Sequence, residues 1–174
     1  MSSTSESQAT AAPGAEHRDL AAMAGKYLTF QLGKEEYGLP VLKVREIIKL
    51  LEITPVPQAP PHVKGVINLR GKVIPVIDLR LKFQLPFQEY DARTAIIVVE
   101  VVGINGPLLM GIIVDTVSEV LNITADEIEG TPDFGEHVRT DYMRGVAKVK
   151  GTVKILLDLD RAFAEDAGMA SQAA

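Results

Sequence analysis

Two aspartates in matching sequence contexts are the first residues that could carry chemistry. Asp78 lies in IDLR and Asp158 in LDLD, and a pair of such carboxylates could share a proton as in an aspartic protease. That chemistry places each aspartate in a loop of small residues, D-T-G, whereas here Asp78 lies between an isoleucine and a leucine and Asp158 between two leucines. A carboxylate at the end of an apolar run suits the capping of a following turn or helix. We therefore predict that neither aspartate is catalytic.

The remaining reactive side chains are scattered along the chain. None of the three histidines, His17, His62 and His137, has another histidine or a carboxylate at a metal-ligand spacing, so each is expected to be an ordinary surface or loop residue. The chain contains no cysteine, which excludes a thiol nucleophile and suits a reducing cytosol. No GxSxG, P-loop or GxGxxG motif is present. The sequence predicts no enzyme, no metal and no cofactor.

Composition narrows the class of partner. With 174 residues and a formal net charge of −5, the chain lacks the concentrated basic surface that a nucleic-acid-binding protein requires. Four tyrosines, five phenylalanines and no tryptophan also offer few rings on which bases could stack. No apolar run approaches the ~18 residues that span a bilayer. We expect neither a nucleic-acid partner nor direct membrane insertion.

The two ends of the chain are rich in small and polar residues. Residues 1–25 are rich in Ser, Ala and Thr and are predicted to be a disordered tail; a short amphipathic helix over residues 18–23 is the alternative. Residues 164–174, AEDAGMASQAA, are predicted to be a flexible C-terminal tail. Residues 26–163 form the predicted folded unit.

That folded unit repeats itself. YGLPVLKVREI (37–47) matches MGIIVDTVSEV (110–120) at an offset of 73, and KGVINLRGKVIPVIDL (64–79) matches RGVAKVKGTVKILLDL (144–159) at an offset of 80. The larger second offset predicts about seven extra residues within 135–142. A pair of unrelated, similar hairpins is the alternative, but two matched blocks in the same order favour duplication of a small β unit. The repeats would span about 26–85 and 92–163.

Strand and turn signals agree with a duplicated β unit. YLTFQL (27–32) and AIIVVEVV (95–102) have the composition and length of strands. Asn105-Gly106 is typical of a hairpin turn, because both residue types tolerate positive φ. Gly71 and Gly151 each interrupt an apolar run where a tight turn would lie. Since closure removes exposed strand edges, we expect small closed barrels.

Other signals qualify this picture. Pro75 lies inside an apolar run, which predicts an edge strand or a bulge at that place. LPVLKVREII (39–48) has both helical spacing and β-branched content and stays ambiguous. Thr124 and Glu127 form a capping-box pattern that predicts a short helix, and DLDRAF (158–163) predicts a C-terminal one. The fold class is mainly β with few short helices.

The run VKGVINLRGKVIPVIDLR, preceded by EEYGLPVLKVREI and followed by GIIVDTVSEVL, resembles the CheW family of bacterial chemotaxis coupling proteins. The resemblance covers about residues 26–163. It implies two packed five-stranded SH3-like β-barrels, between which strands can cross, and no catalytic activity. It also implies a cytoplasmic adaptor that couples the cytoplasmic tip of methyl-accepting chemoreceptors to the regulatory domain of the histidine kinase CheA. Such an adaptor is recruited to membrane receptor arrays through its partners.

The resemblance gives a role to Arg70, which lies beside Gly71 among apolar residues. From its surroundings alone, Arg70 is a solvated turn residue. By resemblance it matches a receptor-binding position, and a planar guanidinium suits the binding of carboxylates or carbonyls on a helical hairpin. The matching place in the second repeat holds Lys150, which lacks that planar fork.

Further interface residues follow from the same resemblance. Receptor binding is implied for Val44, Glu46, Gly65, Asn68 and Gly71, in addition to Arg70. For Val44 core packing is an equal alternative, and Gly65 can be required for its backbone alone. Gly111 and Val117 match a second-half interface. The resemblance names no residue of the kinase-binding face.

Overall fold

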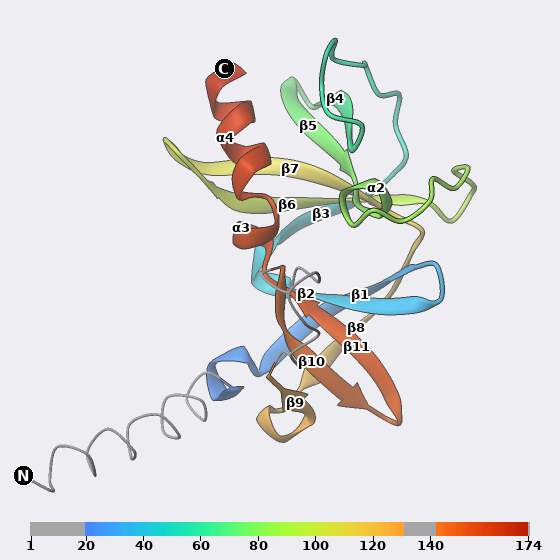
Figure 1. Ribbon diagram of the computed structural model, residues 1–174, viewed down its shortest axis with the longest axis vertical. Helices are drawn as coiled ribbons and strands as arrows, with labels where there is room; N and C mark the ends of the chain where they lie inside the picture. Colours follow the sequence, from blue (N-terminus) through green and yellow to red (C-terminus); the bar gives the residue numbers. More distant parts are fainter. Residues whose placement is uncertain (1–19, 131–141, 174) are drawn as a thin grey trace, which may run out of the picture.

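The computed structural model describes residues 20–130 and 142–173 and is built mainly of β-strands (Figure 1). The strands are β1 Gly25–Leu32, β2 Glu35–Pro40, β3 Val44–Lys49, β4 Val63–Leu69, β5 Lys72–Asp78, β6 Ala95–Gly103, β7 Gly106–Val114, β8 Thr116–Ile123, β9 Ile128–Glu129, β10 Met143–Val149 and β11 Thr152–Leu157. The helices are η1 Val41–Lys43, α2 Leu79–Lys82, η2 Ala125–Glu127, α3 Leu159–Ala162 and α4 Ala164–Ala173, of which η1 and η2 are short 3₁₀ turns.

The strands form two sheets, and each sheet combines strands of both repeats. One has the order β3-β6-β7-β5-β4 and the other β8-β1-β2-β11-β10-β9. In Figure 1 the five-stranded sheet occupies the upper part of the molecule and the six-stranded sheet the lower part. β1 and β2, which belong to the first repeat, thus lie in the six-stranded sheet. β6 and β7, which belong to the second repeat, lie in the five-stranded sheet. Crossing of strands between the barrels, an expectation from the family, is present.

Each sheet is closed into a small SH3-like barrel by the segment that follows one of its edge strands. After β3 the chain passes to the opposite edge, where Thr54 and Val66 of β4 exchange two backbone hydrogen bonds of 2.9 Å. After β8, the two-residue strand β9 pairs with β10 in the same manner. The expected closure is confirmed, and β9 makes the second sheet one strand larger than expected.

The duplication is visible where the repeats meet. β5 runs parallel to β7 with Val76 opposite Gly111, and β11 runs parallel to β2 with Leu156 opposite Gly38. The offsets of 73 and 80 convert one pair into the other. At both places a side chain on a neighbouring strand leaves little room for a Cβ: one on Gly38 would lie 3.0 Å from Leu156 Cδ2 of β11, and one on Gly111 would lie 2.9 Å from Ile96 Cγ2 of β6.

The core has three parts. One cluster lies inside the five-stranded barrel and includes Ile67, Ile74 and Ile96; a second, inside the six-stranded barrel, includes Tyr27 and Ile123. The largest cluster draws residues from both sheets and from the C-terminal helices, and we call it the shared core. Its buried members are Leu28, Phe30, Leu32, Leu39, Ile77, Leu79, Ile97, Val99, Val101, Met110, Ile112, Val114, Leu157, Leu159, Ala162, Phe163 and Ala167.

The tight turns lie where the glycines predicted them. Arg70-Gly71 connects β4 to β5 with φ of 51° and 87°, and Lys150-Gly151 connects β10 to β11 with φ of 53° and 79°. The predicted hairpin at Asn105-Gly106 also forms between β6 and β7. Of the two central residues of this turn, only Gly106 has a positive φ, of 114°. The turn is therefore not of type I′, in which both central residues have positive φ.

The expectation for Pro75 is wrong, because β5 is not an edge strand and the register shift in the β4–β5 ladder falls near the start of β4. Val66, opposite Pro75, donates its backbone N–H to Thr54 O and accepts from Thr54 N through its own carbonyl. The ladder therefore requires no N–H from Pro75 on that side. On the other side, pairing of β5 with β7 begins only at Val76. The proline lies where neither neighbouring strand needs its missing donor.

One ambiguous segment is resolved by the structure, and two local predictions are confirmed. The ambiguous segment 39–48 contains the 3₁₀ turn η1 and then strand β3. Thr124 and Glu127 form the capping box of η2. Asp78 and Asp158 act as N-caps, accepting hydrogen bonds from Leu81 N at 3.3 Å and Arg161 N at 3.1 Å.

The ends of the folded unit differ from expectation. The segment expected to be a flexible C-terminal tail forms α4, on which Asp166 and Ala167 are buried. At the other end, residues 20–23 are helical, and Leu20 and Met23 pack against the core of the six-stranded barrel. The amphipathic-helix alternative therefore describes residues 20–23. The predicted disorder of residues 1–19 and the insertion predicted within 135–142, apart from Tyr142, lie outside the described residues.

These contacts predict the effect of truncation. Removing residues 1–24 deletes Leu20 and Met23, and should lower the free energy of unfolding by about 1–3 kcal/mol through lost apolar burial. Removing residues 1–19 retains both side chains and is the matched control. The measurement is thermal unfolding of both truncated chains and the full chain. Equal melting temperatures for the two truncations would show that the packing of Leu20 and Met23 adds no stability.

Candidate protein-interaction site

The hairpin tip between β4 and β5 is held in one conformation by its own hydrogen bonds. The side chain of Asn68, the residue before Leu69, accepts a hydrogen bond of 2.8 Å from the backbone N–H of Gly71. Arg70 and Gly71 both adopt positive φ, which is easy for glycine and uncommon for arginine. At this turn the Arg70 side chain is 71% exposed.

Arg70 is paired with Glu46 of β3, although the two residues are 24 positions apart in the sequence. Arg70 Nη1 donates to Glu46 Oε1 at 3.0 Å, and Nη2 donates to Oε2. The hydrogen bonds from Arg70 lower the pKa of the Glu46 carboxyl, and the same contact raises the pKa of Arg70. A bidentate pair of this kind fixes the plane of the guanidinium. Two residues that the family resemblance linked to receptor binding are thus in direct contact.

The equivalent tip of the second repeat has a different surface. Lys148 and Lys150 are both exposed there, and Glu119 occupies the place that corresponds to Glu46. Among the described residues, Lys150 forms no ion pair or side-chain hydrogen bond. The two tips share a backbone conformation but present different groups to a partner.

The other two residues implied for receptor binding, Val44 and Gly65, are packed within the fold. Val44 is half-buried and packs against the shared core. Gly65 is buried with φ of 142°, and a Cβ there would lie 2.0 Å from the carbonyl oxygen of Thr54. The structure therefore gathers Glu46, Asn68, Arg70 and Gly71 at one exposed tip and places Val44 and Gly65 in the packing beside and beneath it.

The second-half residues do not join this tip. Gly111 is buried at the parallel pairing of β7 with β5. Val117 lies on β8 of the six-stranded sheet and is half-buried against the shared core. Packing accounts for both residues. A direct contact of either with a partner remains a prediction.

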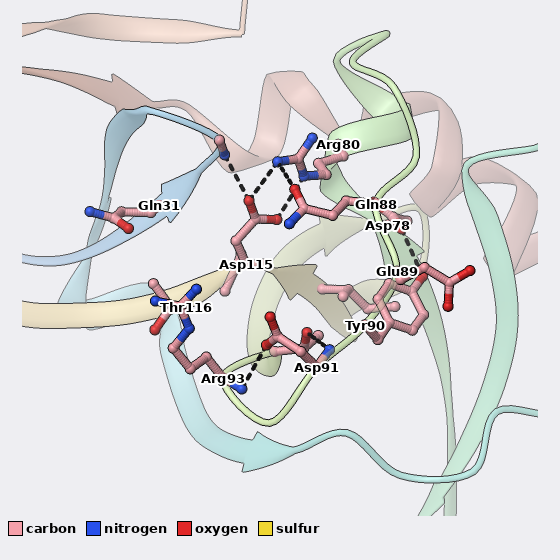
Figure 2. A pocket seen from close by; sticks show the side chains of 14 residues that line it. Gln31, Asp78, Arg80, Gln88, Glu89, Tyr90, Asp91, Arg93, Asp115 and Thr116 are labelled. Carbon is pink, nitrogen blue, oxygen red and sulfur yellow. Dashed lines mark hydrogen bonds and ion pairs between the residues drawn. The ribbon is translucent and has the colours of Figure 1, made fainter.

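A polar hollow lies at the junction of the two barrels, and several of its side chains are bonded to one another (Figure 2). Arg80 of α2 forms an ion pair with Asp115, with an Nη2–Oδ2 distance of 2.7 Å, and also donates to Pro86 O at 3.1 Å. Asp115 accepts from Gly33 N in the β1–β2 turn at 2.7 Å. Burial alone would raise the pKa of Asp115, but the hydrogen bonds from Arg80 and Gly33 lower it. This arrangement joins the two barrels through a network of charged and backbone groups.

The paired aspartates considered first for catalysis are also engaged. Besides capping α2, Asp78 accepts a hydrogen bond of 2.7 Å from the hydroxyl of Tyr90, and burial together with this bond raises the pKa of Tyr90. Asp158 caps α3 and lies 3.7 Å from Arg161. Within residues 20–130 and 142–173, no cluster of His, Asp and Glu could hold a metal ion.

Sequence reasoning missed the role of His62. We expected an ordinary surface or loop residue, but its Nε2 lies 2.7 Å from Asp166 Oδ1, and the carboxylate is buried. The two residues are 104 positions apart, and no local pattern connects them. His17 and His137 lie outside the described residues.

Comparison with known proteins agrees with the fold. The family model described as "CheW-like domain" matches residues 26–167. The chain belongs to the CheW-like family. It is 38% identical over 141 residues to the chemotaxis protein CheW of Klebsiella aerogenes, covering 81% of this chain and 82% of that protein. It is also 35% identical over 136 residues to CheW of Rhizobium meliloti, covering 78% and 85%.

A solved CheW structure supports the same assignment. The scaffolding protein TtCheW from Thermoanaerobacter tengcongensis has a TM-score of 0.72 and 37% sequence identity, over 81% of this chain and 93% of that one. As a CheW-like protein, the chain is a chemotaxis adaptor of the scaffold type. In the part of the chain that the structure describes, no helix is long and apolar enough to cross a membrane.

The packing around Gly65 predicts how its loss would act. Gly65→Ala places a Cβ against the Thr54 carbonyl at a φ that favours glycine, and should destabilise the fold by about 2–5 kcal/mol. Gly130→Ala is the matched control, since a Cβ there meets nothing within 4 Å. Denaturant unfolding of both variants measures the effect. A Gly65→Ala variant that unfolds like the wild type yet binds partners poorly would instead make Gly65 a contact residue.

Proposed function

We propose that this CheW-like protein couples the cytoplasmic tip of methyl-accepting chemoreceptors to the regulatory domain of the histidine kinase CheA, without catalysing a reaction. The observation that carries the proposal is the Arg70–Glu46 pair at an exposed hairpin tip. A CheW-like fold supplies the adaptor framework, and this tip supplies a defined polar contact for the receptor.

The geometry of Arg70 suits a helical partner. A guanidinium has five N–H donors, and the two hydrogen bonds to Glu46 leave other donors for a second acceptor. Because Glu46 already fixes the plane of the group, less side-chain entropy is lost when a partner binds. Carboxylates and carbonyls on a receptor helical hairpin are the matching acceptors. A transient contact of this kind can be small, below ~1,200 Å².

The second partner requires a separate surface. β8 is an edge strand of the six-stranded sheet and exposes Val120, which is 53% accessible. An apolar barrel edge on the side opposite the Arg70 tip would let the kinase regulatory domain bind without competing with the receptor. Recruitment through these two contacts would bring a cytoplasmic adaptor to the receptor array.

The absence of catalysis rests on what the reactive residues already do. Asp78 and Asp158 cap helices, and the Arg80–Asp115 hollow is internally bonded. Such groups stabilise the fold and offer neither a nucleophile nor a free general base.

Substitution of Arg70 tests the receptor contact. Arg70→Ala should change the free energy of unfolding by no more than ~0.5 kcal/mol, because its ion pair is on the surface. Receptor binding should weaken by ~2 kcal/mol or more, about thirtyfold. Arg70→Lys keeps the charge without the planar fork and should restore only part of the affinity.

Lys150→Ala is the matched control, since Lys150 occupies the same turn of the second repeat. A receptor-tip fragment and a CheA regulatory domain are titrated against each variant, with melting curves recorded alongside. Kinase binding should be unchanged in all three. If Arg70→Ala binds the receptor fragment as tightly as the wild type, Arg70 is a solvated turn residue.

A further inference from the structure

Short helices reach from each barrel to the other. α2 follows β5 of the five-stranded sheet and ends beside Phe83. The Phe83 ring packs against Tyr37 of β2, with 5.8 Å between ring centroids, and against Tyr142, which precedes β10, at 5.7 Å. α2 thus carries an aromatic side chain from the first sheet to the strands of the second.

The C-terminal helices make the reciprocal connection. α3 and α4 follow β11, the last strand of the six-stranded sheet. α4 then packs against β6 of the five-stranded sheet, and Phe163 and Ala167 enter the shared core. Figure 1 shows α4 rising from the end of the lower sheet to stand against β6.

These two connections are bonded to each other. Lys82, the last residue of α2, lies 2.8 Å from Asp166 Oδ2 of α4, while His62 Nε2 lies 2.7 Å from Oδ1 of the same carboxylate. The side chains of Lys82 and Asp166 are only 6% and 4% exposed. The Lys82 ammonium also lies over the rings of Tyr142 at 5.5 Å and Phe163 at 5.9 Å. One buried carboxylate therefore connects α4, α2 and the segment before β4.

A buried pair of this kind depends strongly on its geometry. Removing one partner of a buried ion pair leaves the other charge without compensation, whereas removing an exposed charge costs little. If α4 shifted relative to α2, Lys82 would keep its charge in an apolar site without a counter-ion. The cluster thus resists relative movement of the two connections more firmly than apolar packing alone, which tolerates sliding.

We propose that Lys82, Asp166 and His62 form an inter-barrel clasp, which fixes the orientation of one barrel relative to the other. Where the proposed adaptor function holds, the clasp also sets the angle between the receptor and the kinase bound on different barrels. The clasp itself requires no partner, so it is tested on the isolated protein.

The absence of cysteine makes the test direct. Val73→Cys on β5 and Val153→Cys on β11 place one spin label on each sheet, at exposed positions related by the offset of 80. Pulsed dipolar spectroscopy on the full chain then gives the distribution of distances between the labels. In the labelled parent the distribution should be single and narrow. Adding Asp166→Asn should broaden it at least twofold, because Lys82 loses its counter-ion.

Glu165→Gln is the matched control, since it removes one negative charge from the adjacent, exposed position of α4. It should leave the distribution unchanged. His62→Asn removes one partner of Asp166 but keeps the Lys82–Asp166 contact, so it should broaden the distribution by a smaller amount. If Asp166→Asn fails to fold, His62→Asn is the variant that tests the clasp. Folded Asp166→Asn and His62→Asn variants with the parent's narrow distribution would overturn the clasp. Equal broadening by Glu165→Gln would overturn it as well. Receptor or kinase titrations play no part in this readout, so failure of the adaptor proposal would be seen separately.

Discussion

One apolar core shared by both sheets is the constraint on which the rest of the structure depends. Along β6, Ile97 and Val99 point into the shared core, whereas Ile96 and Val98 point into the interior of the five-stranded barrel. The strand is therefore buried on both faces, which accounts for its nearly continuous apolar run. Because both sheets and the C-terminal helices contribute to this core, neither barrel could be removed without exposing the other's apolar surface.

Burial of the central strands leaves the hairpin tips as places where charge can vary freely. The tips at Arg70-Gly71 and Lys150-Gly151 have nearly the same backbone conformation, so the fold requires the turn and not the side chain before the glycine. Arg70 meets Glu46 across the barrel, while the equivalent Lys150 has no such partner among the described residues. Duplication thus provides two copies of one scaffold whose tips have diverged in chemistry.

The features predictable from the sequence are those set by neighbouring residues or by the repeat. The aspartate caps, the capping box at Thr124 and the turns at Gly71 and Gly151 all depend on a few adjacent positions. Pro75 was misjudged because its tolerance depends on where two other strands pair. Asp166 was assigned to a flexible tail because of the small-residue composition of α4. That composition does not reveal that the Asp166 carboxylate contacts His62 and Lys82. The resemblance identified Arg70 and Glu46 individually, but only the fold brings them into contact.

The two ion pairs at the barrel junctions have their charges reversed. In one the helix after a repeat's last strand supplies the positive charge, and in the other it supplies the negative charge. At one junction Arg80 of α2 pairs with Asp115, between β7 and β8; at the other Asp160 of α3 pairs with Lys43, between β2 and β3. Each ion pair therefore joins one repeat to the other. By the repeat offset of 73, a repeat folded on itself would bring Arg80 to Leu42, beside Lys43, and would bring Asp160 to Thr116, beside Asp115, so each charge would lose its oppositely charged partner. Unfavourable pairing of this kind selects among otherwise similar contacts. The inverted charges thus match the exchange of strands between repeats on which the shared core depends.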